Sequence, residues 1–246
     1  MVDIHSHILP GLDDGPEIMK ETIAMVDMAA RNEIHHIVAS SHGNYYSYAL
    51  QEYHHQLERL QQEIRARQIP VTLYPGMEIF INEQALHLLE TEQLLSINHT
   101  NYLLIEFPFE ENPENVCRYI DKLQNKNYNI ILAHPERYIF MQKNPELAWY
   151  LEETGCVLQV NKGSLLGDFG EKCRVLAKEM LDDGIVRVIG TDAHDTIYRS
   201  PDLGRLMRML KGEYSPAEIR LWLSENPSRI LKGCPTIGLN VRKEEE

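Results

Sequence analysis

Cysteine is scarce in this chain of 246 residues, which has only four, and no C-x-x-C pair occurs among them. They are Cys117, Cys156, Cys173 and Cys234. Their wide and unpatterned spacing argues against a disulfide framework and against a zinc ribbon. We therefore expect reduced thiols with mostly structural roles.

Positive charge is also in short supply, since 24 Lys and Arg residues stand against 37 Asp and Glu residues, a formal net charge of −13 at pH 7. Nucleic-acid binders depend on Lys and Arg side chains that neutralise phosphates, so this balance disfavours a nucleic-acid partner. It favours a small molecule or a protein as the substrate.

Long apolar segments are missing too, because no stretch approaches the roughly 18 consecutive apolar residues that a membrane span needs. No basic and then apolar leader is seen at the start of the sequence, so we expect no membrane span and a cytoplasmic location. No Gly/Ser/Pro-rich linker divides the chain. The sequence therefore predicts one domain over residues 1–236, followed by a charged tail over 237–246.

Short apolar segments that suit buried strands recur along the chain, and helical periodicity follows each of them. Strands are predicted at 2–8, 34–40, 71–74, 102–107, 129–133, 157–160 and 186–190. Helices are predicted at 16–31, 51–66, 82–89, 113–125, 145–153, 171–183, 202–210 and 216–224. Repeated strand–helix units indicate an α/β protein with a parallel sheet covered by helices. We predict a closed seven-stranded, TIM-like (β/α) barrel, with an open doubly wound sheet as the alternative.

Ionisable side chains follow nearly every predicted strand at its carboxyl end. They are His5, His7, Asp13, Asp14, His42, Glu78, Glu106, His134, Asp192 and His194. In parallel α/β folds the loops converge at that end, and functional sites are built there. His5 and His7 are two positions apart on an extended strand and so point to the same face. Mixed imidazole and carboxylate sets suit Mn, Fe or Zn, so the sequence predicts one metal cluster.

Single members of this set have ordinary alternatives: His134 can end a strand, and Glu106 can pair with an arginine in the core. Together they are hard to explain in that way, because burying unpaired charged and polar groups is costly. The histidine pairs at 35–36 and 54–55 are interpreted as structural or surface features. Adjacent residues of a helix, such as the second pair, face apart.

The successive motifs resemble those of the polymerase and histidinol phosphatase (PHP) superfamily. They are Asp3-Ile4-His5-Ser6-His7, Asp13-Asp14-Gly15, Ser41-His42, Gly76-Met77-Glu78-Ile79, Ile105-Glu106-Phe107, His134-Pro135-Glu136-Arg137 and Thr191-Asp192-Ala193-His194. Within this superfamily the chain is similar to the capsule-type, manganese-dependent protein-tyrosine phosphatases of Gram-positive bacteria, over about residues 1–232. The resemblance implies a distorted seven-stranded β/α barrel.

The resemblance also implies a site and a reaction. It assigns up to three divalent ions, Mn²⁺ first with Fe or Zn as alternatives, to His5, His7, Asp14, His42, Glu78, Glu106, His134, Asp192 and His194. Arg137 and Arg199 would bind the phosphate as the catalytic arginines, and a metal-activated hydroxide would attack phosphorus. The implied substrate is the phosphorylated tail of a bacterial tyrosine kinase that governs capsule or exopolysaccharide synthesis.

Three tyrosines, Tyr45, Tyr46 and Tyr48, lie just past His42. We interpret them as an aromatic rim that binds a phosphotyrosine ring or peptide. The alternative is an ordinary loop whose rings cover the end of the barrel.

Other functions are open at this point. A histidinol phosphatase would use a similar metal set, the acidic balance disfavours a nuclease or other phosphodiesterase, and a regulatory scaffold without activity would not need every ligand. A phosphatase with a cysteine nucleophile is excluded, because that mechanism needs an arginine six positions after the cysteine and none of the four has one.

Overall fold

The computed structural model describes residues 1–239. The rest of the predicted charged tail, 240–246, lies outside the described residues. Within 1–239, no helix is both long and apolar enough to cross a membrane.

Eight strands form within the described part of the chain. They are β1 (Val2–Ser6), β2 (His36–Ala39), β3 (Thr72–Pro75), β4 (Glu78–Phe80), β5 (Tyr102–Glu106), β6 (Asn129–Ala133), β7 (Val157–Asn161) and β8 (Val186–Gly190). All the strand pairs are parallel, and the two sheets have the orders β1-β2-β3 and β4-β5-β6-β7-β8. The predicted α/β class with parallel strands is confirmed.

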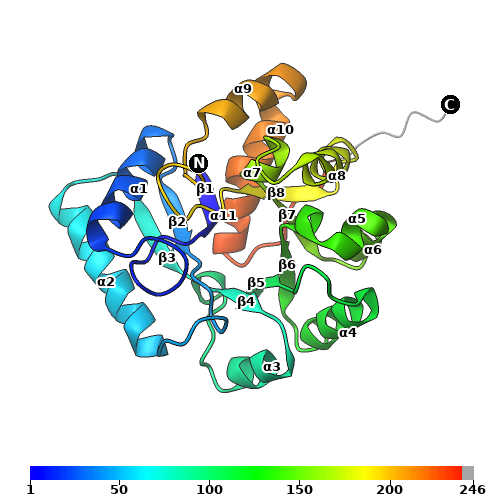
Figure 1. Ribbon diagram of the computed structural model, residues 1–246, viewed down its shortest axis with the longest axis horizontal. Coiled ribbons are helices and arrows are strands. Elements are labelled where there is room, and N and C mark those ends of the chain that lie inside the picture. Colours follow the sequence, from blue (N-terminus) through cyan, green and yellow to red (C-terminus); the bar gives the residue numbers. More distant parts are fainter. Residues whose placement is uncertain (240–246) are drawn as a thin grey trace.

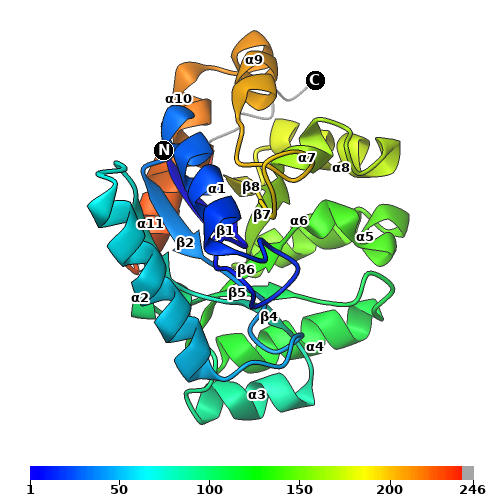
Figure 2. The ribbon, with the colours of Figure 1, turned by 60° about the vertical axis from the view of Figure 1, so that its left-hand side comes forward.

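Helices lie around the outside of the strands (Figure 1). The α-helices are α1 (Met19–Arg31), α2 (Leu50–Ala66), α3 (Glu83–Glu90), α4 (Pro113–Gln124), α5 (Ile139–Lys143), α6 (Glu146–Glu153), α7 (Lys162–Leu165), α8 (Glu171–Asp182), α9 (Gly204–Glu213), α10 (Pro216–Arg220) and α11 (Asn226–Leu231). Two 3₁₀ turns, η1 (Ile97–His99) and η2 (Pro135–Arg137), and one π-helical turn, η3 (Leu221–Glu225), complete the set. Figure 2 shows α1 and α2 side by side in front of the three-stranded sheet.

The sheet differs from the predicted closed, seven-stranded barrel, because residues 1–239 have eight strands in two sheets. The third predicted strand is where the difference arises. Pro75 ends β3, and β4 begins at Glu78 in the other sheet. Proline has no N–H to continue a ladder, and a Cβ on Gly76 would lie 2.6 Å from Cγ1 of Val38. The chain therefore changes sheets at this Pro-Gly step while it packs closely against β2.

Isolated bridges join the two sheets at both junctions. Ser6 pairs with Ala193 beside β1 and β8, and His42 pairs with Glu78 beside β2 and β4. The Asp192 N–H donates to the His5 carbonyl oxygen at 2.8 Å across the first junction. Four candidate ligands therefore belong to the backbone contacts that join the sheets: His5, His42, Glu78 and Asp192.

Alternate residues of the strands pack into two apolar clusters. On β5, Leu103 and Ile105 belong to the large cluster between strands and helices, whereas Tyr102 and Leu104 belong to a smaller one. The smaller cluster also contains Ile230 of α11 and the first residues of β1 and β7. Apolar side chains thus fill the amino ends of the strands, which leaves the carboxyl ends for polar groups.

Candidate metal centre

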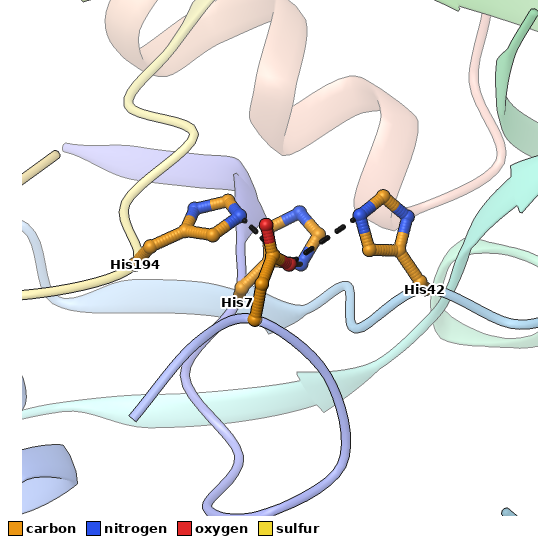
Figure 3. A group of neighbouring side chains, drawn as sticks. His7, His42 and His194 are labelled. Atoms are coloured by element: carbon orange, nitrogen blue, oxygen red, sulfur yellow. Dashed lines mark ion pairs between the residues drawn. The ribbon is translucent and has the colours of Figure 1, made fainter. Parts of the chain in front are cut away.

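The structure brings all nine residues implied as metal ligands together at the carboxyl ends of the strands. They form four overlapping groups, in each of which one ligand atom per residue lies within 4.8 Å of the others. The groups are His7, Asp14, His42 and His194; His5, His134 and Asp192; His5, His7 and Glu78; and His42, Glu78 and Glu106. Figure 3 shows the rings of His7, His42 and His194 turned toward one another from different loops.

Glu78, at the start of β4, lies at the centre of the cluster. Its Oε1 is 3.0 Å from Nε2 of His134 and 3.3 Å from Nε2 of His5, and its Oε2 is 3.2 Å from Nε2 of His7. The carboxylate is buried together with these rings. Such a carboxylate can face several metal positions at once, since each of its oxygens is close to a different set of imidazoles.

Asp14 closes the outer edge of the cluster. Its Oδ1 lies 3.2 Å from Nε2 of His194 and 3.5 Å from Nε2 of His42. Burial raises its pKa, but the nearby imidazoles outweigh burial, with His194 the largest contributor, and hold the pKa below the usual range. The ionised form of this half-exposed carboxylate is therefore favoured.

Neighbouring charges shift the pKa values of the inner cluster. Burial lowers the pKa of His5, but the carboxylates of Glu78 and Asp192 outweigh that effect and raise the pKa to about 9. Burial also raises the pKa of Asp192, and His5 and Arg199 more than offset it, so the pKa lies well below normal. Excess negative charge is thus balanced by protons where a cation can bind.

An orphaned ligand atom shows that a metal fits this donor set. Among the described residues, Oδ1 of Asp192 is buried without a hydrogen-bond partner. Buried polar atoms of this kind are costly unless something satisfies them. Imidazole nitrogens and carboxylate oxygens are common ligands of divalent Mn, Fe and Zn. A divalent ion of this class would satisfy the unpartnered oxygen.

The backbone is strained at two of these residues. His134 and Asp192 have φ values of 37° and 51°, in the left-handed region that residues other than glycine rarely adopt. Each such residue costs on the order of 1–3 kcal/mol and is found mostly at functional sites. The strain places both side chains at the cluster directly after β6 and β8.

Both predicted arginines reach the cluster through Asp192. Nη2 of Arg199 lies 2.6 Å and Nη1 of Arg137 lies 3.3 Å from Oδ2 of Asp192. The Arg137 guanidinium also lies over the rings of Phe109, at 4.9 Å, and Phe169, at 4.4 Å. The two planar cations are therefore held in place at the edge of the metal ligands.

A cavity of about 400 Å³ opens onto this cluster. Glu78, Glu106 and His134 form its polar side together with both arginines. Its aromatic side consists of Tyr45, Tyr46, Phe80, Phe107 and Phe109. The cavity is thus lined by charged and aromatic side chains together.

Tyr48 has a different place from the predicted rim. It is not among the residues lining the cavity, whereas Tyr45 and Tyr46 are. Its hydroxyl donates to the carbonyl oxygen of His42 at 2.5 Å, and burial raises its pKa. Tyr48 therefore supports the loop that carries His42.

Asp13 has a role that the sequence reasoning did not assign. Its Oδ2 lies 2.9 Å from Nδ1 of His7 and accepts from the His42 N–H at 3.0 Å, while Oδ1 accepts from the Gly15 N–H. A carboxylate on the second ring nitrogen orients a metal-binding histidine. The Asp13-Asp14 pair thus divides its tasks, one carboxylate facing the cluster and the other behind it.

The end of β7 was also missed. Gln159 and Asn161 lie there, fully buried and two positions apart, and contact His5 and Asp192. The same spacing at His5-x-His7 and Asp192-x-His194 was the signal that could have found them.

Comparison with known proteins places the chain among bacterial phosphatases. A family model described as capsular polysaccharide synthesis, CpsB/CapC, matches residues 1–232. The tyrosine-protein phosphatase YwqE of Bacillus subtilis (strain 168) is 33% identical over 237 residues, covering 94% of this chain and 92% of the relative. The putative tyrosine-protein phosphatase CapC of Staphylococcus aureus is 35% identical over 250 residues, covering 99% and 98%.

Solved structures agree with these relatives. One described as YwqE from Bacillus subtilis and CpsB from Streptococcus pneumoniae, unique metal-dependent tyrosine phosphatases, matches with a TM-score of 0.89 and 32% identity over 97% of each chain. A phosphotriesterase homology protein from Escherichia coli matches with a TM-score of 0.63 at 10% identity over 93% of this chain and 98% of that one. The second likeness concerns the fold alone.

Proposed function

The chain belongs to the CpsB/CapC family of capsular polysaccharide synthesis, and on that premise we propose that it is a metal-dependent tyrosine-protein phosphatase. The observation that carries this proposal is a cluster of nine imidazole and carboxylate ligands, five of which line one cavity together with two arginines. Such an arrangement suits the hydrolysis of a phosphate monoester.

The metal ligands in this proposal are His5, His7, Asp14, His42, Glu78, Glu106, His134, Asp192 and His194. They would hold up to three divalent ions, with Mn²⁺ as the first choice and Fe or Zn as alternatives. When bound, such ions stabilise the charge of the phosphoryl group and lower the pKa of the attacking water toward about 7. The overlap of the four groups supports more than one ion position.

Arg137 and Arg199 bind the phosphate in this proposal. A guanidinium presents a planar fork of donors that matches two phosphate oxygens. Arg137 is fixed between two rings and Arg199 by its pair with Asp192, so neither has to be ordered when the substrate arrives. They hold the phosphorus in one orientation relative to the metal ligands.

Tyr45 and Tyr46 bind the phenyl ring of the substrate. Their rings line the cavity with that of Phe109, and each tyrosine ring lies 5.6 Å from the ring of His42. Aromatic pairs contribute about 0.5–1.5 kcal/mol beyond the area that they bury. A phenol leaves with a pKa of about 10, so the reaction makes little demand for a general acid, and we assign none.

The substrate that we infer is a phosphotyrosine protein, the tail of a bacterial tyrosine kinase that controls capsule or exopolysaccharide synthesis. The resemblance of the motifs and the names of the relatives support it. A cytoplasmic location would give the phosphatase access to such a kinase.

The test compares a phosphotyrosine peptide with histidinol phosphate, using chelator-stripped protein with and without Mn²⁺. We expect Mn²⁺-dependent phosphate release from the peptide alone. Glu78→Gln should lose metal and at least about 100-fold in rate, because one central carboxylate serves several positions. The surface variant Glu63→Gln, whose parent only pairs with Arg67, is the control. Release from histidinol phosphate instead would move the protein to amino-acid biosynthesis and overturn the proposal.

A further inference from the structure

Strand β7 ends at the cluster with two neutral amides. Among the described residues, the candidate ligands lie on β1, β4 and β5 or in the segments that follow β1, β2, β6 and β8, and none lies on β7. In their place β7 carries Gln159 and Asn161, both fully buried. Buried amides need hydrogen-bond partners, so the partners of these two side chains indicate what they do beside the ionisable groups.

The direction of their hydrogen bonds follows from Asp192, whose carboxylate only accepts. Nδ2 of Asn161 donates to Oδ2 of Asp192 at 2.6 Å, which leaves Oδ1 of Asn161 as an acceptor. Nε2 of Gln159 donates to that oxygen at 2.9 Å and to the Val160 carbonyl oxygen at 2.8 Å. Both donor hydrogens of Gln159 are then used, and its Oε1 is free to accept.

That oxygen lies 2.7 Å from Nδ1 of His5. Because Oε1 of Gln159 can only accept, the proton of this bond belongs to Nδ1 of His5. The lone pair of a neutral His5 then lies on Nε2, which is 3.3 Å from Oε1 of Glu78 and 3.4 Å from Oδ1 of Asp192. The chain of bonds thus sets which nitrogen of His5 faces the cluster.

At the Asp192 end, this series of hydrogen bonds determines which carboxylate oxygen is free. Oδ2 accepts from Asn161 and is paired with Arg199 and Arg137. Oδ1 is buried and has no hydrogen-bond partner among the described residues. One oxygen is occupied and the other is available to a cation.

Gly190, at the end of β8, leaves room for the side chains of Gln159 and His5. A Cβ there would lie 2.8 Å from Nε2 of Gln159 and 3.1 Å from Cβ of His5. Any side chain would displace the amide or the imidazole. The sequence therefore leaves room at this position for the contact between β1 and β7.

We propose that Gln159 and Asn161 are positioning residues that hold Nε2 of His5 and Oδ1 of Asp192 toward the same metal position. The inference rests on the metal dependence in the proposed function. Residues behind the ligands that orient them in this way are typically worth 10- to 100-fold in metal affinity.

The test compares four proteins: the unchanged chain, Gln159→Leu, Gln159→Glu and Asn226→Leu. Gln159→Leu removes the acceptor of His5, whereas Gln159→Glu keeps an acceptor oxygen at nearly the same volume and loses only the donors to Asn161 and Val160. Asn226 is a fully buried amide that bonds Arg187 and Ile237 away from the cluster, so its variant is the control for lost stability. The Mn²⁺ dissociation constant is measured by chelator competition, and the Nδ1–H proton of His5 by NMR of the Zn²⁺-loaded protein.

We expect Gln159→Leu to raise the dissociation constant about 10- to 100-fold and to shift the Nδ1–H resonance upfield. Gln159→Glu should keep the downfield resonance, and Asn226→Leu should lower the melting temperature with metal affinity within twofold. A dissociation constant within twofold for Gln159→Leu, or an equal loss for Asn226→Leu, would overturn the inference. If Gln159→Leu does not fold, loss of the downfield resonance in Gln159→Glu overturns it.

These readouts are independent of the reaction. Absence of phosphotyrosine hydrolysis by the unchanged, metal-loaded protein would refute the proposed function, and the metal affinities would still decide the role of Gln159. Wild-type activity together with unchanged affinity in the variants would refute only the positioning role.

Discussion

Nη2 of Arg199 lies 2.6 Å from Oδ2 of Asp192, so an arginine proposed to bind phosphate is already paired with a proposed metal ligand. Arg199→Ala should therefore affect both metal and substrate, because it leaves a fully buried carboxylate short of a cationic partner. We expect metal content to fall together with a loss of about 100-fold or more in kcat/KM. Metal analysis beside steady-state kinetics checks this. Full metal content with only a higher KM would show that the pair with Asp192 is unimportant for metal binding.

Arg137 predicts a different outcome, since its pair with Asp192 is longer and two rings hold its guanidinium. Arg137→Lys should lower kcat/KM by about 100-fold with metal content unchanged, because an ammonium cannot form the planar fork. Arg174→Lys, at an exposed ion pair with Glu171, is the matched control. Near-normal kinetics for Arg137→Lys would remove Arg137 from the phosphate clamp.

The pH dependence of stability should differ between metal-free and metal-loaded protein. The pKa of His5 is raised to about 9 in the folded metal-free protein, above its ordinary value of 6.5. Its contribution to stability is thus complete below pH 6.5 and is lost as the pH rises through 9. Metal has to displace that proton, so metal affinity should increase by up to about tenfold per pH unit in the same interval.

Calorimetry between pH 6.5 and 9 checks this prediction. With chelator present, the melting temperature should fall as the pH rises, and excess Mn²⁺ should abolish or reverse the fall. Parallel curves with and without Mn²⁺ would mean that proton release from the cluster is not linked to metal binding.

Thiol chemistry should be irrelevant to activity. Burial raises the pKa of Cys156 to about 12, and burial also raises the pKa values of Cys117 and Cys173. Thiolates are the reactive form, so iodoacetamide near pH 7.5 should change the rate by less than about twofold. A chelator should abolish activity in the same samples. Inactivation by iodoacetamide with the metal retained would contradict a purely metal-based reaction.

The aromatic wall of the cavity should act on substrate binding. Tyr45→Ala removes a ring at the cavity, so KM for a phosphotyrosine peptide should rise about 3- to 10-fold with little change in kcat. Tyr150→Ala removes an exposed ring on α6 that does not line the cavity and is the control. An equal KM for the Tyr45 variant and the unchanged protein would leave the ring without a role in binding.

The ligand cluster was predictable because two strong physical rules act together. Parallel strands bring their carboxyl ends to one edge, and charged groups are rarely buried without a partner. His5, His42, Glu78 and Asp192 are far apart in sequence, yet each lies on an apolar strand or in the segment that follows one. These rules group ten ionisable residues, Asp13 included, and the resemblance to the PHP superfamily selects the nine proposed ligands among them.

The rest was harder to predict because its signals are weak or lie in the geometry. Gln159 and Asn161 are uncharged, so nothing in their chemistry separates them from amides that satisfy a strand end. The break between β3 and β4 depends on Pro75, which a short apolar pattern does not register as a change of sheet. Tyr48 differs from Tyr45 only in the direction of its side chain, and its bond to the His42 carbonyl decides that direction.

The two junctions between the sheets give bound ions a mechanical task. One junction is the Ser6–Ala193 bridge, next to His5, His7 and Asp192, and the other is the bridge between His42 and Glu78 themselves. Within residues 1–239 each junction is a single isolated bridge, so an ion with ligands from both sheets would add contacts where the two sheets share few hydrogen bonds. Removal of the metal would then weaken the contacts between the two sheets, so fold stability and activity would be lost together.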